Sequence, residues 1–426
     1  MKLLSLLGIL LISFPAFSSI QLKELMKFDM SGRVRGEGFG NFGFSDNDDK
    51  GDHRFTSSKF RLTLTTGQAV SKKWKIVFMP QYVKLWGLKE FVGTATNENG
   101  PRITSGSVWD SRFDVHAAYI DWRPNEKWTF QIGRQIISYG DQLIIGALEW
   151  NPYGRAFDAV RVKFNYPSGH VDFYWGDVQI HTANRNDSGN FNYLGLYSPN
   201  DFGAYLRNTD FYVMWKKDHS SILRSEHLDT WAYGVRVKSK EGIYDYRIEL
   251  TGEKAKVKEQ YRNFEYQTDI EVGFQIKAIK TRLALEYFRA SKDYDQFYPT
   301  AHKWLGYGDQ FGRRNIQGFR VGLKPKITNN LFFTLDYHAF YRVDNTAPAY
   351  KLSGATPYGD GSENDSFGLA NEFDIKIYWD VYDNYRIELG YAFVAPNGYL
   401  DGVSNGSGGV RNENVNWAYL SFEAKI

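Results

Sequence analysis

The sequence predicts an all-β protein, an 18-stranded antiparallel transmembrane β-barrel, with a 16-stranded barrel as the nearest alternative. Three observations support this prediction. Many short segments alternate apolar and polar residues, the gaps between them alternate long and short, and the chain starts with an export signal. Segments 373–379 and 385–393 are the clearest, because apolar or aromatic residues occupy every second position. Such alternation places successive side chains on opposite faces of a strand, and many strands of about ten residues are what a membrane-spanning barrel requires.

The composition agrees with strands and excludes several classes of protein. The 426 residues include 29 Tyr, 31 Phe, 12 Trp and 40 Gly, a mixture that favours strands and turns. A mean hydropathy of −0.48 excludes a membrane-spanning helical bundle, whereas a barrel hides its apolar half in the alternation. The net charge of +3 is too small for the basic surface of a nucleic-acid binder. The absence of Cys excludes disulfides and thiolate metal sites.

The N-terminus predicts export. Lys2 precedes the apolar run 3–17, and small residues follow at a suitable cleavage point, so residues 1–18 are predicted to be a signal peptide. A membrane anchor is the alternative, but the run is shorter than the roughly 20 residues that a spanning helix needs. We expect a short periplasmic segment at 19–27 and a barrel over 28–426, in the outer membrane of a Gram-negative bacterium.

The strands follow from the alternation, in chain order. Their predicted ranges are 28–40, 57–69, 73–86, 112–123, 128–137, 156–166, 170–178, 191–198, 208–217, 229–239, 243–253, 266–277, 280–290, 314–325, 330–342, 370–380, 385–395 and 415–426.

The connections between the strands predict which end of the barrel faces outward. Short turns rich in Gly, Pro, Asn and Ser, which allow tight reversals, are predicted at 71–72, 124–127, 167–169, 240–242, 328–329 and 383–384. Long polar gaps lie at 41–56, 87–111, 138–155, 291–313, 343–369 and 396–414. With the N-terminus in the periplasm, every short turn is periplasmic and nearly every long gap is extracellular, as in bacterial outer-membrane barrels. The connection 199–207 is long for a periplasmic turn.

Aromatic residues are expected on the lipid-facing side, where amphipathic rings suit the two membrane–water boundaries. Those predicted to face outward are Trp74, Tyr119, Trp175, Trp231, Tyr244, Tyr385, Tyr391 and Phe393.

The opposite positions of the strands are expected to line a lumen. In chain order, the predicted pore-lining residues are Arg33, Arg35, Arg61, Arg161, Lys163, Arg236, Arg247, Glu249, Arg282, Arg320, Arg342 and Arg386. Further carboxylates share this face, among them Glu37, Asp245, Asp269, Glu271, Glu286, Asp336 and Glu388. Arg binds carboxylates and phosphates in a two-pronged geometry, so an Arg-rich constriction favours anions. A barrel of about 16–18 strands is wide enough for an aqueous channel, and Tyr and Trp among these residues are a hypothetical slide for sugar rings.

Two stretches of the chain resemble the alginate export family of outer-membrane barrels. The first comprises Gly133-Arg134-Gln135, Tyr139-Gly140-Asp141-Gln142, Gly146, Trp150-Asn151 and Gly154-Arg155-Ala156-Phe157-Asp158. The second comprises residues 298–307, Asp309 and Asn315-Ile316. The resemblance implies an 18-stranded channel for anionic polysaccharide, with Arg134, Asp141, Arg155 and Asp158 as residues of a constriction or as anchors of an inward-folded loop. The chain departs from the family in its mixed lumen charge and in ending with Ile426, where an aromatic residue is usual.

Several motifs are rejected as active sites. Residues 402–406 fit the G-x-S-x-G pattern of hydrolases, but no helical sequence follows, as that motif requires. Residues 46–52 imitate a calcium loop without its closing Glu. The acidic loop with Asp360, Glu363 and Asp365 receives the same interpretation.

We therefore predict a passive channel for an anionic saccharide or a similar small anion, without catalytic residues, metal ligands or cofactors. Two alternatives remain open: a barrel lipase or protease with its active site at the rim, and an adhesive or structural barrel. The expected partners are outer-membrane lipid, lipopolysaccharide and the barrel assembly machinery, with no nucleic acid, and the expected oligomeric state is a monomer.

Overall fold

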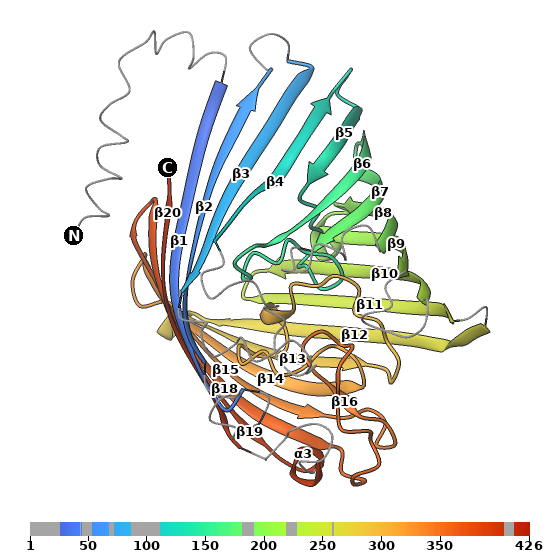
Figure 1. Cartoon of the computed structure of the whole chain (residues 1–426), viewed down its shortest axis with the longest axis vertical. Coiled ribbons are helices and arrows are strands. Elements are labelled where there is room, and N and C mark those ends of the chain that lie inside the picture. The colour runs from blue at the N-terminus through green and yellow to red at the C-terminus, as the bar shows by residue number, and fades with distance from the viewer. Residues whose placement is uncertain are drawn as a thin grey trace.

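A closed β-barrel dominates the computed structural model, which describes residues 26–42, 44, 53–67, 72–86, 111–180, 191–218, 228–257, 260–403 and 413–426. Eighteen strands form one antiparallel sheet in which each strand pairs with its neighbours in chain order and the last strand pairs with the first (Figure 1). The barrel strands are β1 (Met26–Gly40), β2 (His53–Thr66), β3 (Trp74–Trp86), β4 (Ser111–Trp122), β5 (Trp128–Gln135), β6 (Arg155–Tyr166), β7 (Gly169–Ile180), β8 (Phe191–Asn200), β9 (Asn208–Asp218), β10 (Leu228–Glu241), β11 (Tyr244–Val257), β12 (Gln260–Ile276), β13 (Thr281–Ala290), β14 (Ile316–Pro325), β15 (Leu331–Tyr341), β18 (Gly368–Tyr382), β19 (Tyr385–Pro396) and β20 (Val415–Lys425).

All the predicted strands are present, so the prediction of 18 strands is confirmed and the 16-stranded alternative is wrong. The largest differences lie at strand ends that adjoin the long connections. Strand β2 begins at His53 rather than at 57, and β12 begins at Gln260 rather than at 266. Both strands continue because the neighbouring strand offers backbone partners there, Phe39 for β2 and Val257 for β12.

The seam between β1 and β20 closes the ring. Pairing runs from Ser31 opposite Lys425 to Gly40 opposite Asn416. Ile426 continues the ladder beyond the last strand, because its backbone exchanges hydrogen bonds of 2.7 and 2.8 Å with Met30. The chain end therefore completes the barrel without a terminal aromatic residue.

Side chains alternate between a lipid-facing surface and the lumen, as the sequence predicts. On β18, Phe373 and Trp379 are each 45% exposed on the outer face, whereas Glu372 and Asp374 are buried inside. No helix among the described residues is long and apolar enough to cross a bilayer.

A β-bulge overturns one outward prediction. Val115 and Ala117 of β4 pair with consecutive residues of β3, so His116 is an extra residue. A bulge shifts the alternation by one position, and Tyr119 therefore shares the inner face with Val77, which it opposes. The prediction that Tyr119 faces lipid is wrong for this reason.

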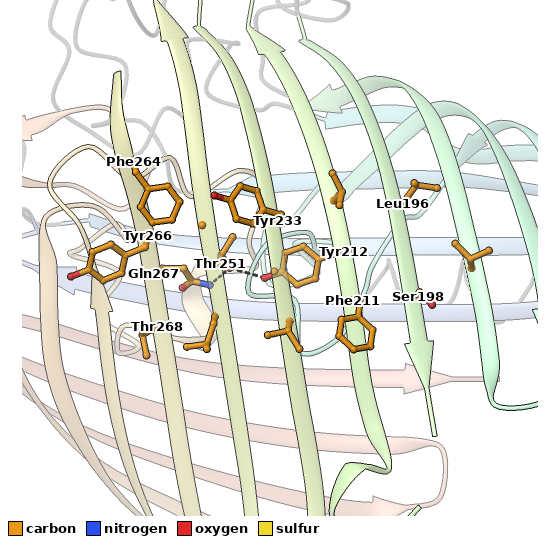
Figure 2. A pocket seen from close by; sticks show the side chains of 16 residues that line it. Leu196, Ser198, Phe211, Tyr212, Tyr233, Thr251, Phe264, Tyr266, Gln267 and Thr268 are labelled. Atoms are coloured by element: carbon orange, nitrogen blue, oxygen red, sulfur yellow. Dashed lines mark hydrogen bonds between the residues drawn. The ribbon is translucent and has the colours of Figure 1, made fainter. Parts of the chain in front are cut away.

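A groove of about 760 Å³ crosses the outer face of β7 to β12 (Figure 2). Its surface is mainly apolar, with rings of Tyr233 and Phe264 filling the space above Gly252. A Cβ atom at Gly252 would lie 2.7 Å from the Phe264 ring, so the glycine makes this packing possible.

The connections differ strongly between the two ends of the barrel. One end, predicted from the sequence to be periplasmic, carries short turns, including the connection 201–207, which is compact because it contains the 3-10 helix η3 (Ala204–Leu206). At the other end, the long connections contain η5 (Ala301–Lys303), the hairpin β16 (Ala349–Tyr350) and β17 (Pro357–Tyr358), and α3 (Tyr399–Gly402). Figure 1 shows the β5–β6 and β13–β14 connections inside the ring of strands. The predicted segments 1–18 and 46–52 lie outside the described residues, and so does most of the predicted segment 19–27, whose last two residues belong to β1.

An outward-facing charge at mid-strand tests the lipid-facing surface. Val321 lies at the centre of β14 and is exposed, so Val321→Arg should destabilise the folded barrel by about 2–4 kcal/mol. Ile279→Arg, in the turn between β12 and β13, should cost only about 0–1 kcal/mol because the interface is hydrated. Equilibrium denaturant unfolding in lipid vesicles measures both changes, and equal costs would contradict the assigned membrane position.

Candidate functional site

Two long connections fold into the lumen and pair with each other there. Lumen loop 1 (136–154) joins β5 to β6, and lumen loop 2 (291–315) joins β13 to β14. The backbone of Tyr298 in lumen loop 2 donates to Ile144 and accepts from Gly146, with 2.9 Å in both hydrogen bonds. The two stretches that carry the family resemblance are therefore the two loops that meet inside the barrel.

Arg155 fixes this meeting point. Its side chain is buried and donates to the backbone carbonyl of Gly146 at 3.2 Å, of Pro299 at 3.2 Å and of Tyr298. The guanidinium group has several donors in a fixed fork, which allows it to tie both loops together at once. The structure thus places Arg155 as a loop anchor.

Glu149 attaches lumen loop 1 to the barrel wall. Its carboxylate accepts hydrogen bonds from Arg61 at 2.8 Å and from Lys59 at 3.1 Å. Burial would raise the pKa of the Glu149 carboxyl, but the charges of Lys59 and Arg61 outweigh burial and lower it to about 2. The carboxylate is therefore ionised, and the anchor intact, over the physiological range.

Arg33 and Arg35 hold the same loop through its backbone. Both donate to the carbonyl of Trp150, at 3.0 and 2.8 Å. The Arg35 guanidinium also lies 3.7 Å from the centre of the Trp150 ring, a cation–π contact. These predicted pore-lining residues contact the loop rather than an open passage.

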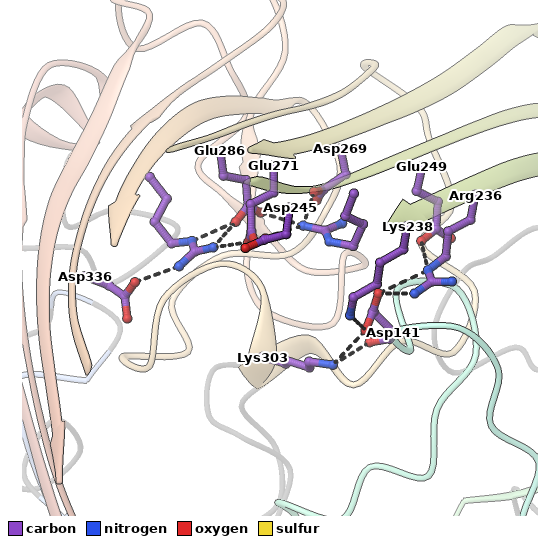
Figure 3. Close-up of polar contacts among 12 residues, drawn as sticks. Asp141, Arg236, Lys238, Asp245, Glu249, Asp269, Glu271, Glu286, Lys303 and Asp336 are labelled. Atoms are coloured by element: carbon purple, nitrogen blue, oxygen red, sulfur yellow. Dashed lines mark hydrogen bonds and ion pairs between the residues drawn. The ribbon is translucent and has the colours of Figure 1, made fainter. Parts of the chain in front are cut away.

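The tip of lumen loop 1 carries Asp141, which gathers three cations (Figure 3). Its carboxylate accepts from Lys238 at 2.8 Å and from Arg236, and its backbone carbonyl accepts from Lys303 of lumen loop 2 at 3.0 Å. Burial would raise the pKa of Asp141, but Arg236 and Lys238 hold it well below its usual range. The side chains of Lys238 and Lys303 are 48% and 46% exposed, so both reach water in the lumen.

The wall beside the tip is a lattice of ion pairs (Figure 3). Arg247 contacts Asp269 at 2.7 Å and Glu286 at 3.5 Å. Arg320 contacts Glu286 at 2.6 Å and Asp336 at 2.7 Å. Each Arg thus shares carboxylates with the next, and the network cross-links strands from β11 to β15.

Other predicted lumen residues are paired in the same way. Arg282 contacts Glu271 at 2.5 Å and also Asp245, and Arg161 contacts Asp172. The remaining predicted residues also lie on the luminal face of their strands. Glu249 lies beside Arg236 and Tyr212. Lys163 lies near the end of β6 that adjoins a short turn, and Arg386 lies at the corresponding end of β19, where it pairs with Asp380 at 2.6 Å.

Arg342 anchors a third connection. It is fully buried and donates to backbone carbonyls of Ala347 at 3.0 Å and Asn364 at 2.8 Å. Its guanidinium also lies 3.8 Å from the centre of the Tyr399 ring. Arg342 therefore holds the 342–367 connection in place.

Arg134 and Asp158 lie on the other face of the sheet. They oppose each other in the register and pair at 2.7 Å, on the parity of Ile132 and Val160. Ile132 is 59% exposed on the lipid-facing surface. The pore-lining assignment of Arg134 and Asp158 is therefore corrected: the pair braces the base of lumen loop 1 from outside the lumen.

One aromatic cluster inside the barrel packs the two lumen loops together. Trp150 stacks on His302 at 4.0 Å between ring centres and meets Tyr419 edge-on at 4.9 Å. Trp417, beside them, is buried, so this cluster packs lumen loop 1 against lumen loop 2 and β20.

Two residues that the predicted set omits are structurally central. Glu149 is absent from the predicted pore-lining residues, although a carboxylate within a motif facing inward Arg residues is a detectable signal. Asn315 is buried; its side-chain amide donates to three carbonyls, including Ala347 at 3.1 Å, and its oxygen accepts from Asp344 at 2.8 Å. The sequence indicates Asn315 only as part of a motif, because its partners lie about thirty residues downstream.

The described residues contain no group of three or more His, Asp or Glu side chains placed to hold a metal ion. Gly402 ends α3, and the serine of the G-x-S-x-G pattern lies outside the described residues. In the acidic loop, Glu363 accepts from the backbone of Asp360 and Gly361 and from Tyr399, so it stabilises the loop internally.

Comparisons with known proteins agree with this geometry. The sequence family described as Alginate export matches residues 89–400, a range that includes both lumen loops. A search of curated protein sequences found no match.

Solved outer-membrane barrels share the fold. OccAB2 of Acinetobacter baumannii has a TM-score of 0.61 at 10% identity, and a BenF-like porin from Pseudomonas fluorescens Pf-5 has 0.62 at 8%. OpdK of Pseudomonas aeruginosa, crystallised with vanillate, has 0.59 at 10%. Each alignment covers 94% of this chain and 98% of the other. Together these comparisons indicate an outer-membrane transport channel rather than an enzyme.

Removing the Arg155 anchor should loosen both lumen loops. Arg155→Gln leaves buried carbonyls without donors, at about 1–3 kcal/mol for each unsatisfied group, so single-channel conductance should rise and become noisier. Arg386→Gln is the control, because its exposed ion pair with Asp380 contributes about 0–1 kcal/mol. Planar-bilayer recording and thermal unfolding measure both effects, and an unaltered Arg155→Gln channel would contradict the anchoring role.

The Glu149 anchor should fail only in acid. A carboxyl whose pKa falls from 4.5 to about 2 on folding contributes its full stabilisation above 4.5 and loses it as the pH decreases toward 2. Conductance should therefore be constant from pH 7 to 5 and change below about pH 4. Glu149→Gln should show the altered conductance at pH 7 already, and a wild-type change near pH 6 would refute this assignment.

Proposed function

Because the chain belongs to the alginate export family, we propose that its barrel is a passive outer-membrane channel for an anionic saccharide or a similar small anion. The lumen is narrowed by two loops, each held by several hydrogen bonds and ion pairs. Such a constriction restricts solutes by size and charge rather than leaving a wide unselective pore.

The observation that carries the anionic preference is the composition of the loop tip. Asp141 is the carboxylate shared by Lys238, Lys303 and Arg236. Arg236 has a second acidic partner, Asp210, at 2.8 Å. The two half-exposed lysines therefore share one carboxylate and leave positive potential at the constriction, which favours an anion in transit.

The arginines of the wall contribute less to the proposed anion selectivity than their number suggests. Arg247 and Arg320 each contact at least two carboxylates in the lattice. Paired charges of this kind largely cancel at a distance, since the field of a neutralised pair falls off faster than that of a lone charge. In the proposed mechanism these residues stiffen the wall, and the lysines at the tip attract the solute.

Two solute classes follow from this arrangement and differ in size. A uronate oligosaccharide agrees with the family, whereas a small carboxylate such as vanillate is the ligand in one crystal structure of the barrel neighbour OpdK. The proposed selectivity is for the carboxylate group, and the width of the passage between the loops decides the size.

Neutralising the loop-tip lysines should reduce anion preference. The wild-type channel in a tenfold KCl gradient should show an anion-biased reversal potential, and Lys238→Gln with Lys303→Gln should shift it toward zero by at least half. The control is Lys72→Gln with Lys127→Gln, which removes equal charge from exposed periplasmic turns. A cation-biased wild type, or equal shifts in both double variants, would refute the proposed selectivity.

A further inference from the structure

A charged cavity lies at the periplasmic end of the barrel, and none of its lining residues belongs to either lumen loop. It has a volume of about 520 Å³ and lies between the turn that joins β12 to β13 and the turn that joins β14 to β15. Gln275 and Arg282 oppose each other in the register on the luminal parity of these strands. Cavities of roughly 300–1,000 Å³ are typical of small-molecule sites.

The strand register places like charges side by side in this cavity. Arg282 of β13 is directly opposite Lys324 of β14. Like charges in directly opposed positions destabilise a sheet. Arg282 is compensated by Asp245 and Glu271, but these carboxylates lie on its far side, on β11 and β12. Lys324 therefore retains an uncompensated charge.

Three more lysines join Lys324 at the cavity. Lys277, Lys280 and Lys326 line it and are exposed. Within the described part of the chain, none of the four lysines forms an ion pair with a carboxylate. In the middle of the lumen, by contrast, the cations of the wall lattice are paired. The cavity thus concentrates positive charge that the protein itself does not neutralise.

The backbone around these lysines is fixed. Lys280 adopts a left-handed conformation with φ of 48°, and its carbonyl accepts a 3.1 Å hydrogen bond from the backbone of Lys326. This hydrogen bond links the two turns, so the backbone positions from which the Lys280 and Lys326 side chains extend are fixed relative to each other. Ile327 and the ring of Phe332, 5.7 Å from the Lys326 ammonium, add an apolar surface beside the charges.

We propose that this cavity is a binding subsite for a carboxylated saccharide at the periplasmic mouth of the channel. Each uronate ring carries one carboxylate, so neighbouring rings can pair with lysines of both turns, while an apolar sugar face lies against Phe332. The inference rests on the proposed channel function and adds a first docking point, from which the solute moves toward the lysines at the loop tip.

Calorimetric titration of the detergent-solubilised full chain with trigalacturonate tests the subsite. We expect saturable binding that weakens with added salt, as charge-dominated binding does. Lys324→Gln with Lys326→Gln should lower the affinity at least tenfold, and Lys277→Gln with Lys280→Gln should do the same independently. Lys72→Gln with Lys127→Gln, which removes equal charge from two other periplasmic turns, should stay within twofold of the wild type.

Neutral and small titrants decide what the cavity recognises. Maltotriose has the same number of rings without carboxylates and should not bind, and inorganic phosphate should bind more weakly than trigalacturonate. Equal losses in the cavity and control variants, equal binding of maltotriose, or tighter binding of phosphate would each overturn the subsite. The calorimetric titration measures binding independently of ion conduction. A protein that binds trigalacturonate but does not conduct ions would refute the channel. A protein that conducts ions but does not bind trigalacturonate would refute the subsite.

Discussion

The structure depends on one constraint: within a lipid bilayer, every backbone N–H and C=O group must find its partner in the protein. The seam between β1 and β20 meets this constraint, since it removes the two free edges that an open sheet would have. Closure then dictates the alternation along each strand, because one face meets lipid and the other encloses a lumen. Even the last residue follows this rule, with Ile426 hydrogen-bonded to Met30.

The enclosed polar face creates a second requirement, which is to neutralise its own charges. Most luminal arginines meet it locally, as Arg320 does with Glu286 and Asp336. Others, such as Arg155, satisfy buried carbonyls of the inward-folded loops. Most of the arginine content of the lumen is thus structural. Cations that keep part of their field are concentrated at the tip of lumen loop 1 and at the periplasmic mouth.

The sequence predicts what depends on local periodicity and fails where distant segments meet. Strands are recoverable because the two-residue repeat is imposed by lipid on one side and water on the other. The local pattern places Tyr119 on the wrong face because the extra residue His116 leaves no trace in it. The contact between Ile144 and Tyr298 joins residues far apart in the chain, so no spacing rule reveals it. In the sequence, Arg134 shares its parity with Ile132. This parity indicates the lipid-facing side of the sheet, where the structure places Arg134.

The contact between the two lumen loops has a mechanical consequence. Strands β7 to β12 separate the loop bases on one side of the ring, and β15, β18 to β20 and β1 to β4 separate them on the other. The paired loops therefore connect nearly opposite sides of the barrel wall, and they resist flattening of its cross-section under lateral membrane pressure. The contact between the two loops can form only once the sheet has curved enough to bring both loops close together, so curvature of the sheet precedes this contact during folding.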